Sequence, residues 1–144
     1  MYKRQRLSDR LGGHLVSGHV DATGEVTHLE TLPHSWALSI RWSEPRFGRY
    51  VCEKASIALD GISLTVAECS ADGSTFTLAV IPHTWEATTL RLLAVGDTVN
   101  LEADQLARYA ERLLHATAAK DGNADGRKKD DDLSANWLAA HGWS

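Results

Sequence analysis

The stretch Leu59-Asp60-Gly61-Ile62-Ser63-Leu64-Thr65-Val66 combines a tight turn with a strand pattern. Asp60-Gly61 predicts a short reversal of the chain, because glycine adopts a positive φ without steric cost. After the turn, aliphatic residues at 62, 64 and 66 alternate with Ser63 and Thr65. This period of two predicts a strand with one face in a core and hydroxyl groups on the other. The hydroxyl face suits a ligand groove, although an ordinary surface strand is the simpler interpretation of these eight residues alone.

Several similar segments lie on either side of this stretch. The clearest is Trp36–Trp42, in which residues 36, 38, 40 and 42 share an apolar face. Other strand patterns cover residues 25–32, 54–60, 75–81 and 98–103, and a glycine-rich one covers 12–20. Turns are expected at 22–24, 72–74 and 96–97, and short helices after Pro45 and Pro82. Short strands at this spacing predict an all-β antiparallel barrel or sandwich.

The C-terminal part changes to a helical period. Asp104 can cap a helix over 105–120, and this helix carries an apolar stripe of the kind that docks on the same domain or on another subunit: Leu106, Tyr109, Ala110, Leu113 and Leu114. Residues 121–132 are charged and predict a solvated linker, and 133–144 predict a short second amphipathic helix. Residues 1–11 are expected to form a disordered leader. Their composition suggests an assembled fragment that lacks its natural N-terminus.

Composition narrows the function classes. The chain has 144 residues and a net charge of -4, which predicts one domain and disfavours nucleic acid as a partner. No apolar run is long enough for a membrane span, and the first ten residues lack a signal-peptide core, so a cytoplasmic location is expected. Cys52 and Cys69 form no Cys-x-x-Cys pair, which predicts free thiols and no structural metal site.

Two histidines in the glycine-rich segment are candidates for chemistry. On a strand, His14 and His19 would point to opposite faces, so a shared metal ion is not expected. His14 is interpreted as a structural histidine. For His19, beside Gly18 and on the face of Ser17, a role in ligand binding or proton transfer competes with a structural one.

An ordered set of motifs resembles the second half of riboflavin synthase (alpha chain). The resemblance covers residues 12 to 114, and 133–143 is similar to the terminal helix of some members. Its motifs are GGHLVSGHVD at 12–21, KASI at 54–57, DGISLTV at 60–66, IPHT at 81–84 and GDTVNLEAD at 96–104.

The resemblance implies a six-stranded antiparallel Greek-key β-barrel, spanning 12–104 here, with short helices and a C-terminal helix. Family members carry two such barrels and assemble as trimers. They convert two molecules of 6,7-dimethyl-8-ribityllumazine into riboflavin and 5-amino-6-ribitylaminouracil without a metal or cofactor. The active site lies between the C-terminal barrel of one subunit and the N-terminal barrel of its neighbour. The present chain holds one copy of the pattern, so as a lone barrel it is expected to bind the ligand but to turn it over poorly.

The resemblance also assigns residues. The catalytic candidates are His19, Ser63, Thr65 and Asp104, and either His19 or Asp104 could accept the proton that leaves the substrate methyl group. The substrate-binding candidates are Gly18, His19, Val20, Lys54, Ser63, Leu64, Thr65, Ala79, Val80, Ile81, Pro82, His83 and Thr84. Ser63 and Thr65 are expected to bind the edge of the ring system. Two other functions remain open: a non-catalytic lumazine or flavin carrier, and an assembly module whose groove is vestigial.

Overall fold

The computed structural model describes residues 12–121 of the chain. Its strands are β1 (Ala22–Leu32), β2 (Ser35–Trp42), β3 (Ser56–Leu59), β4 (Ile62–Cys69), β5 (Thr75–Val80) and β6 (Thr98–Ala103). Its helices are η1 (Pro45–Tyr50), α1 (Pro82–Ala87), η2 (Thr89–Leu92) and α2 (Gln105–Asp121). The expected leader at 1–11 and the expected segments beyond residue 121, including the terminal helix at 133–144, lie outside the described residues.

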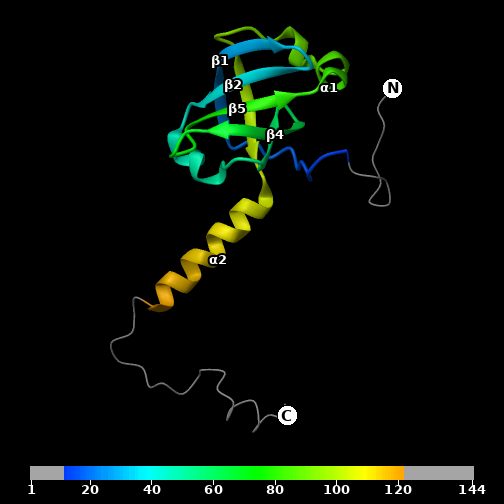
Figure 1. The fold of residues 1–144 in the computed structure, drawn as a ribbon. Helices are drawn as coiled ribbons and strands as arrows, with labels where there is room; N and C mark the ends of the chain where they lie inside the picture. The colour runs from blue at the N-terminus through cyan, green and yellow to red at the C-terminus, as the bar shows by residue number, and fades with distance from the viewer. Residues whose placement is uncertain (1–11, 122–144) are drawn as a thin grey trace, which may run out of the picture. The chain divides into compact units, whose positions relative to one another are not determined.

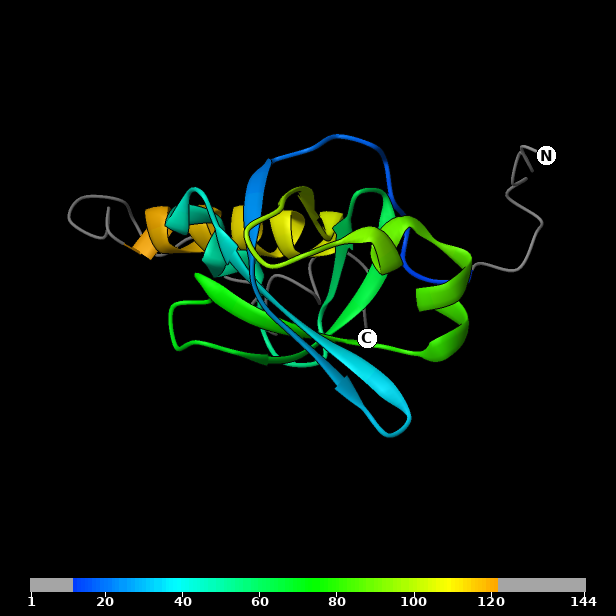
Figure 2. The same ribbon diagram turned by 90° about the horizontal axis from the view of Figure 1, so that it is seen from above.

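The strands form a closed antiparallel barrel in the order β1-β2-β5-β4-β3-β6 (Figure 1). Strands β3, β4 and β5 follow one another as hairpins, and the chain then returns through α1 and η2 to place β6 beside β3. This return is the Greek-key connection. The predicted six-stranded Greek-key barrel is therefore confirmed. Pairing of β1 with β6 covers only Ala22–Glu25, and the outer part of the β1–β2 hairpin extends past its neighbours (Figure 2).

The Asp60-Gly61 turn connects β3 to β4 as predicted. Both residues have a positive φ, 47° and 79°. A two-residue hairpin turn needs this conformation to match the right-handed twist of the two strands it joins. Leu59 pairs with Ile62 across it. The Asp60 carboxylate accepts hydrogen bonds from the backbone and side-chain N–H groups of Asn100, at 2.8 and 3.1 Å. The turn therefore also joins the hairpin to β6.

The barrel interior is filled by the aliphatic and aromatic residues that the alternating patterns placed on one face. Leu38 and Ile40 of β2 are fully buried, and Trp42 is 2% exposed. Trp36, at the other end of β2, is only half-buried and stacks on Trp85 of α1, with ring centroids 5.1 Å apart. The predicted inward face of β2 is therefore correct, and its first residue holds α1 against the barrel.

Two expectations about the first strands are wrong. Residues 12–20 form no strand, because their N–H groups at 14, 17 and 18 are bound by side chains instead of a neighbouring strand. The expected turn at 22–24 is the beginning of β1. Gly24 is there for space: a Cβ would lie 2.6 Å from a methyl carbon of Leu101 and 2.7 Å from one of Ile40.

Helix α2 begins where the sequence predicts. Asp104 Oδ1 accepts a hydrogen bond from the N–H of Leu106 at 2.9 Å, which is the geometry of an N-cap. The barrel and the start of α2 belong to one compact unit, Met1–Ala110, and the rest of α2 belongs to a second, Glu111–Ser144. Among the described helices, none combines the length and the apolar character that a membrane crossing needs.

The turn predicts the result of replacing its glycine. Gly61→Ala should lower the free energy of unfolding by about 1–2 kcal/mol, because a Cβ strains the left-handed backbone although nothing lies within 4 Å of it. Gly12→Ala is the matched control, since its Cβ would also meet nothing and its φ lies outside the left-handed region. Urea unfolding of the two variants measures the difference, and equal midpoints would contradict it.

Candidate functional site

The two hydroxyl residues of β4 lie on the outer face of the barrel. Residues paired across antiparallel strands share a face, and Ser63 pairs with Ala58 of β3, which in turn pairs with Glu102 of β6. In the neighbouring row, Thr65 pairs with Ser56 on one side and Ala79 on the other. The predicted ring-binding residues Ser63, Thr65 and Ala79 therefore share one surface over β4 and β5.

Residues 12–21, here called the N-terminal strap, reach this outer face from the other end of the chain; Figure 2 shows the strap in blue. His14 is hydrogen-bonded to Ser63 Oγ twice, through its backbone N–H at 3.0 Å and through Nδ1 at 2.7 Å. Further along, Ser17 and Gly18 are bound to Glu102 of β6. The strap thus spans the row from β4 to β6, which explains why the outward-facing Ala58 is only 1% exposed.

Glu102 is a carboxylate on the outer face of β6 that is nevertheless 5% exposed. Its Oε1 accepts hydrogen bonds from the Ser17 N–H at 2.8 Å and the Ser17 hydroxyl at 2.6 Å, and its Oε2 accepts from the Gly18 N–H at 2.9 Å. Burial alone would raise the pKa of Glu102, but these hydrogen bonds and the nearby His19 more than offset it, so the pKa lies below its usual value. The group is therefore an anion at neutral pH.

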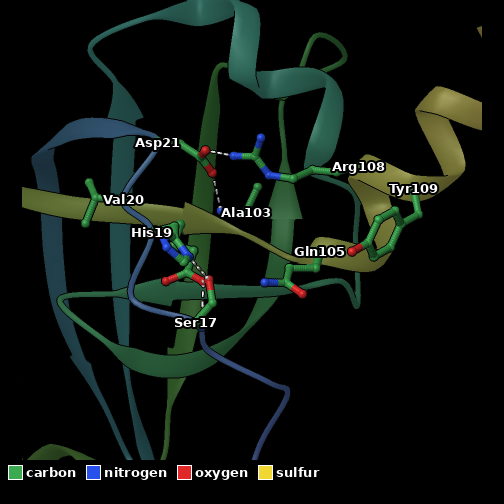
Figure 3. A pocket seen from close by; sticks show the side chains of 9 residues that line it. Ser17, His19, Val20, Asp21, Ala103, Gln105, Arg108 and Tyr109 are labelled. Carbon is green, nitrogen blue, oxygen red and sulfur yellow. Dashed lines mark hydrogen bonds and ion pairs between the residues drawn. The ribbon is translucent and has the colours of Figure 1, made fainter.

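A hollow of about 310 Å³ opens beside Glu102 (Figure 3). The residues around this β6 hollow are Ser17, His19, Val20, Asp21, Glu102, Ala103, Gln105, Arg108 and Tyr109. Asp21 shapes one wall: its carboxylate pairs with the guanidinium of Arg108 and accepts the Ala103 N–H at 2.8 Å. The end of the strap, the end of β6 and the start of α2 are joined there.

A second hollow, of about 340 Å³, lies over the start of β4. The residues around this β4 hollow are Gly12, Gly13, His14, Leu15, Val16, Gly61, Ile62, Ser63 and Thr84. The His14 Nε2 atom is buried and has no hydrogen-bond partner. A buried ring nitrogen left unpaired costs free energy, so a polar group of a ligand would be favoured there.

The predicted site residues divide between these places. His19 and Val20 line the β6 hollow, and Ser63 and Thr84 line the β4 hollow. Gly18 lies between them, with its N–H on Glu102. Asp104 caps α2, next to residues that line the β6 hollow.

The remaining predicted residues lie around them. Thr65, Ala79, Lys54 and the residues at 81–83 are exposed. Leu64 and Val80 have their side chains in the core, so they can meet a ligand only through their backbone. The predicted residues are thus divided between two hollows and positions outside them, and they are not gathered in a single hollow.

Sequence reasoning missed two residues of this region. Glu102 was not singled out from the sequence, because its cover comes from a strap more than 80 residues earlier, which no local pattern reveals. His14 was interpreted as structural, and the structure places its ring on the hydroxyl of Ser63. Within residues 12–121, no group of three histidine, cysteine or acidic side chains is arranged to hold a metal ion.

Riboflavin synthases are among the curated relatives of the chain. Riboflavin synthase of Mycobacterium tuberculosis (strain ATCC 25618 / H37Rv) is 49% identical over 112 residues, which are 76% of this chain and 55% of the relative. Riboflavin synthase of Photobacterium phosphoreum is 46% identical over 105 residues, 73% of this chain and 47% of the relative. The chain therefore spans about half the length of these relatives.

Solved structures with the same fold include LumP complexed with 6,7-dimethyl-8-(1'-D-ribityl) lumazine. Its TM-score is 0.56 at 24% identity, covering 63% of this chain and 49% of that one. LumP complexed with riboflavin has a TM-score of 0.55 at 25% identity, covering 62% of this chain and 46% of that one.

The lumazine binding domain family model matches residues 17–104, from the middle of the strap to the residue that caps α2. This range is more than half of the chain and contains the whole barrel. The chain belongs to the lumazine binding domain family.

Proposed function

We propose that this chain is the C-terminal barrel of a riboflavin synthase, which binds 6,7-dimethyl-8-ribityllumazine on the outer face of β4 and β5. The observation that carries the proposal is the pairing of Thr65 with Ala79 beside Ser63, in a chain 49% identical to a riboflavin synthase. A flat ring needs small side chains beneath it and hydroxyl or amide groups at its edge. Ala79 supplies the small side chain beneath the ring, and Ser63 and Thr65 supply the hydroxyl groups at its edge.

The proposed reaction begins when a base removes a proton from an acidified methyl group of one ligand, and a four-carbon unit then passes to a second ligand stacked on it. The exposed outer face leaves the ring open on one side, where the N-terminal barrel of a neighbouring subunit would bring the second ligand. Catalysis then depends on positioning and on a poised base, without a cofactor. This division of the site explains why a lone barrel should bind better than it turns over.

Binding of ribityllumazine to the chain tests the proposal, and Ser63 is the residue to change. Ser63→Ala should weaken binding by about 1–3 kcal/mol, because a polar group of the ring loses its partner. Ser43→Ala is the matched control, since Ser43 is an exposed serine between β2 and η1. Fluorescence titration measures both. Absence of binding by the unaltered chain at high micromolar ligand would contradict the proposal, and an unchanged affinity in Ser63→Ala would remove Ser63 from the site.

The carrier function is the second candidate, because the LumP structures share the fold and hold lumazine or riboflavin. Supplying an N-terminal barrel of riboflavin synthase in trans distinguishes the two. Riboflavin formation supports the enzyme, whereas tight binding without product supports the carrier. We place either function in the cytoplasm, which fits the two free thiols, Cys52 and Cys69.

The charge of Asp104 can be tested separately from its role as the cap of α2. Asn is as good an N-cap as Asp, so Asp104→Asn should keep the thermal midpoint within about 2 °C while removing the charge. If the carboxylate acts in the reaction, turnover of the assembled enzyme should fall roughly a hundredfold or more with ligand affinity retained. Steady-state kinetics and calorimetry check this outcome. Full turnover in Asp104→Asn would limit the residue to capping.

Helix α2 supplies the proposed surface for assembly into a trimer. Leu106 and Tyr109 are 73% and 64% exposed on it, an unusual position for such side chains unless a partner covers them. Leu106→Glu should therefore reduce the sedimentation coefficient to that of a monomer without changing the barrel's circular dichroism. Arg112→Glu, an exposed charge reversal on the same helix, is the control. Identical sedimentation of Leu106→Glu and the unaltered chain would contradict this role for α2.

A further inference from the structure

Glu102, Ser17 and His19 form a chain of hydrogen bonds from the buried end of β6 to the β6 hollow (Figure 3). The Ser17 Oγ lies 2.6 Å from Glu102 Oε1, and His19 Nδ1 lies 3.0 Å from the same Ser17 Oγ. Ser17 and His19 are two residues apart in the strap, whereas Glu102 lies 85 residues after Ser17. Their order in space, a buried anion, a hydroxyl and an imidazole at a hollow, determines where the hydrogens are.

The direction of each bond follows from counting hydrogens. Glu102 is ionised, so its oxygen can only accept, and the Ser17 hydroxyl must donate to it. A serine hydroxyl has one hydrogen, so Ser17 Oγ can only accept from His19. The contact at 3.0 Å therefore requires a hydrogen on Nδ1 of His19. In the neutral imidazole, Nε2 then carries a lone pair and no hydrogen.

We propose that Glu102, acting through Ser17, is a positioning residue that holds His19 in the Nδ1-protonated tautomer, so that Nε2 is the nitrogen that accepts the substrate proton. The inference rests on the proposed function and deepens it by choosing His19 over Asp104 as the base. Asp104 already uses a carboxylate oxygen to cap α2. Glu102 and Ser17 do not touch the reacting atoms.

The proton transfer balances without a further reactant. The C–H bond of the methyl group breaks, its electrons stay in the conjugated ring, and the proton forms a bond to Nε2. The imidazolium that results keeps its Nδ1–H on Ser17, and its positive charge is offset by Glu102 nearby. This is the same division of roles as in other acid–base relays, where a buried anion orients an imidazole and stabilises its protonated form.

The same anion also places the backbone. The N–H group of Ser17 donates to one carboxylate oxygen of Glu102 and that of Gly18 to the other, so this part of the strap is held against β6. Replacing the carboxylate by an amide would put an NH₂ group against one of these N–H donors. Glu102→Gln therefore tests how the carboxylate holds the strap on β6. Changes at Ser17 test the hydrogen-bond chain from Glu102 to His19.

Nitrogen NMR of the chain with labelled histidine tests the tautomer without a ligand; the His19 signals are identified by their loss in His19→Gln. When the His19 imidazole is neutral, we expect Nδ1 protonated and Nε2 unprotonated in the unaltered chain. Ser17→Ala should shift the population to the Nε2-protonated form, and Ser17→Thr, which keeps the hydroxyl, should restore it. An Nε2-protonated His19 in the unaltered chain, or no change in Ser17→Ala, would overturn the proposal.

The effect on the reaction is measured with an N-terminal barrel supplied in trans. Ser17→Ala should lower turnover roughly tenfold or more with ligand affinity nearly unchanged, and Ser17→Thr should recover it. Glu102→Gln should speed the hydrogen exchange of the Ser17 and Gly18 amides and lower turnover, whereas the exposed control Glu25→Gln should do neither. A tautomer change without loss of turnover would overturn the role of His19 as base. Failure of the unaltered chain to bind ribityllumazine would instead overturn the proposed function, with the tautomer result standing by itself.

Discussion

Strand β6 is the constraint on which the rest of the structure depends, because it closes the barrel. It pairs with β1 on one edge and β3 on the other, and without it both would expose unpaired N–H and C=O groups. Its inward residues Val99 and Leu101 are buried in the core. Its outward residue Glu102 binds the strap, and its end leads into the cap of α2. The barrel, the strap and the helix thus meet on the seven consecutive residues 98–104.

The buried carboxylate makes this junction specific. Taking an anion out of water is costly unless donors replace the water, and three donors from Ser17 and Gly18 do so. No other register of the strap would bring two successive N–H groups and a hydroxyl to the same two oxygens. These three bonds hold Ser17 and Gly18 on β6, and His19 follows directly in the chain and lines the hollow.

The sequence predicted most of the barrel because several strands alternate between inward and outward side chains. Residues 62–66 and 75–80 show which side chains enter the core, and the turn glycine at 61 shows where the chain reverses. It failed at the strap, where glycine and β-branched residues resemble a strand but side chains bind the backbone N–H groups. It failed at Gly24 for a related reason: a glycine that makes room for Leu101 and Ile40 looks the same as one that makes a turn.

The candidate site was predictable only as a set of residue types, since the resemblance assigns residues but not their mutual geometry. The structure adds an asymmetry that the sequence does not contain. Ser63 shares its hydroxyl with His14, whereas Thr65, one row away, is exposed. A ring bound at its edge by both hydroxyls would therefore lie at the border of the strap, with one side on the barrel and the other uncovered. A surface that covers only one side of a flat ligand can bind it, but two such surfaces are needed to hold two rings in contact. Under the proposed function, this chain would supply one of them.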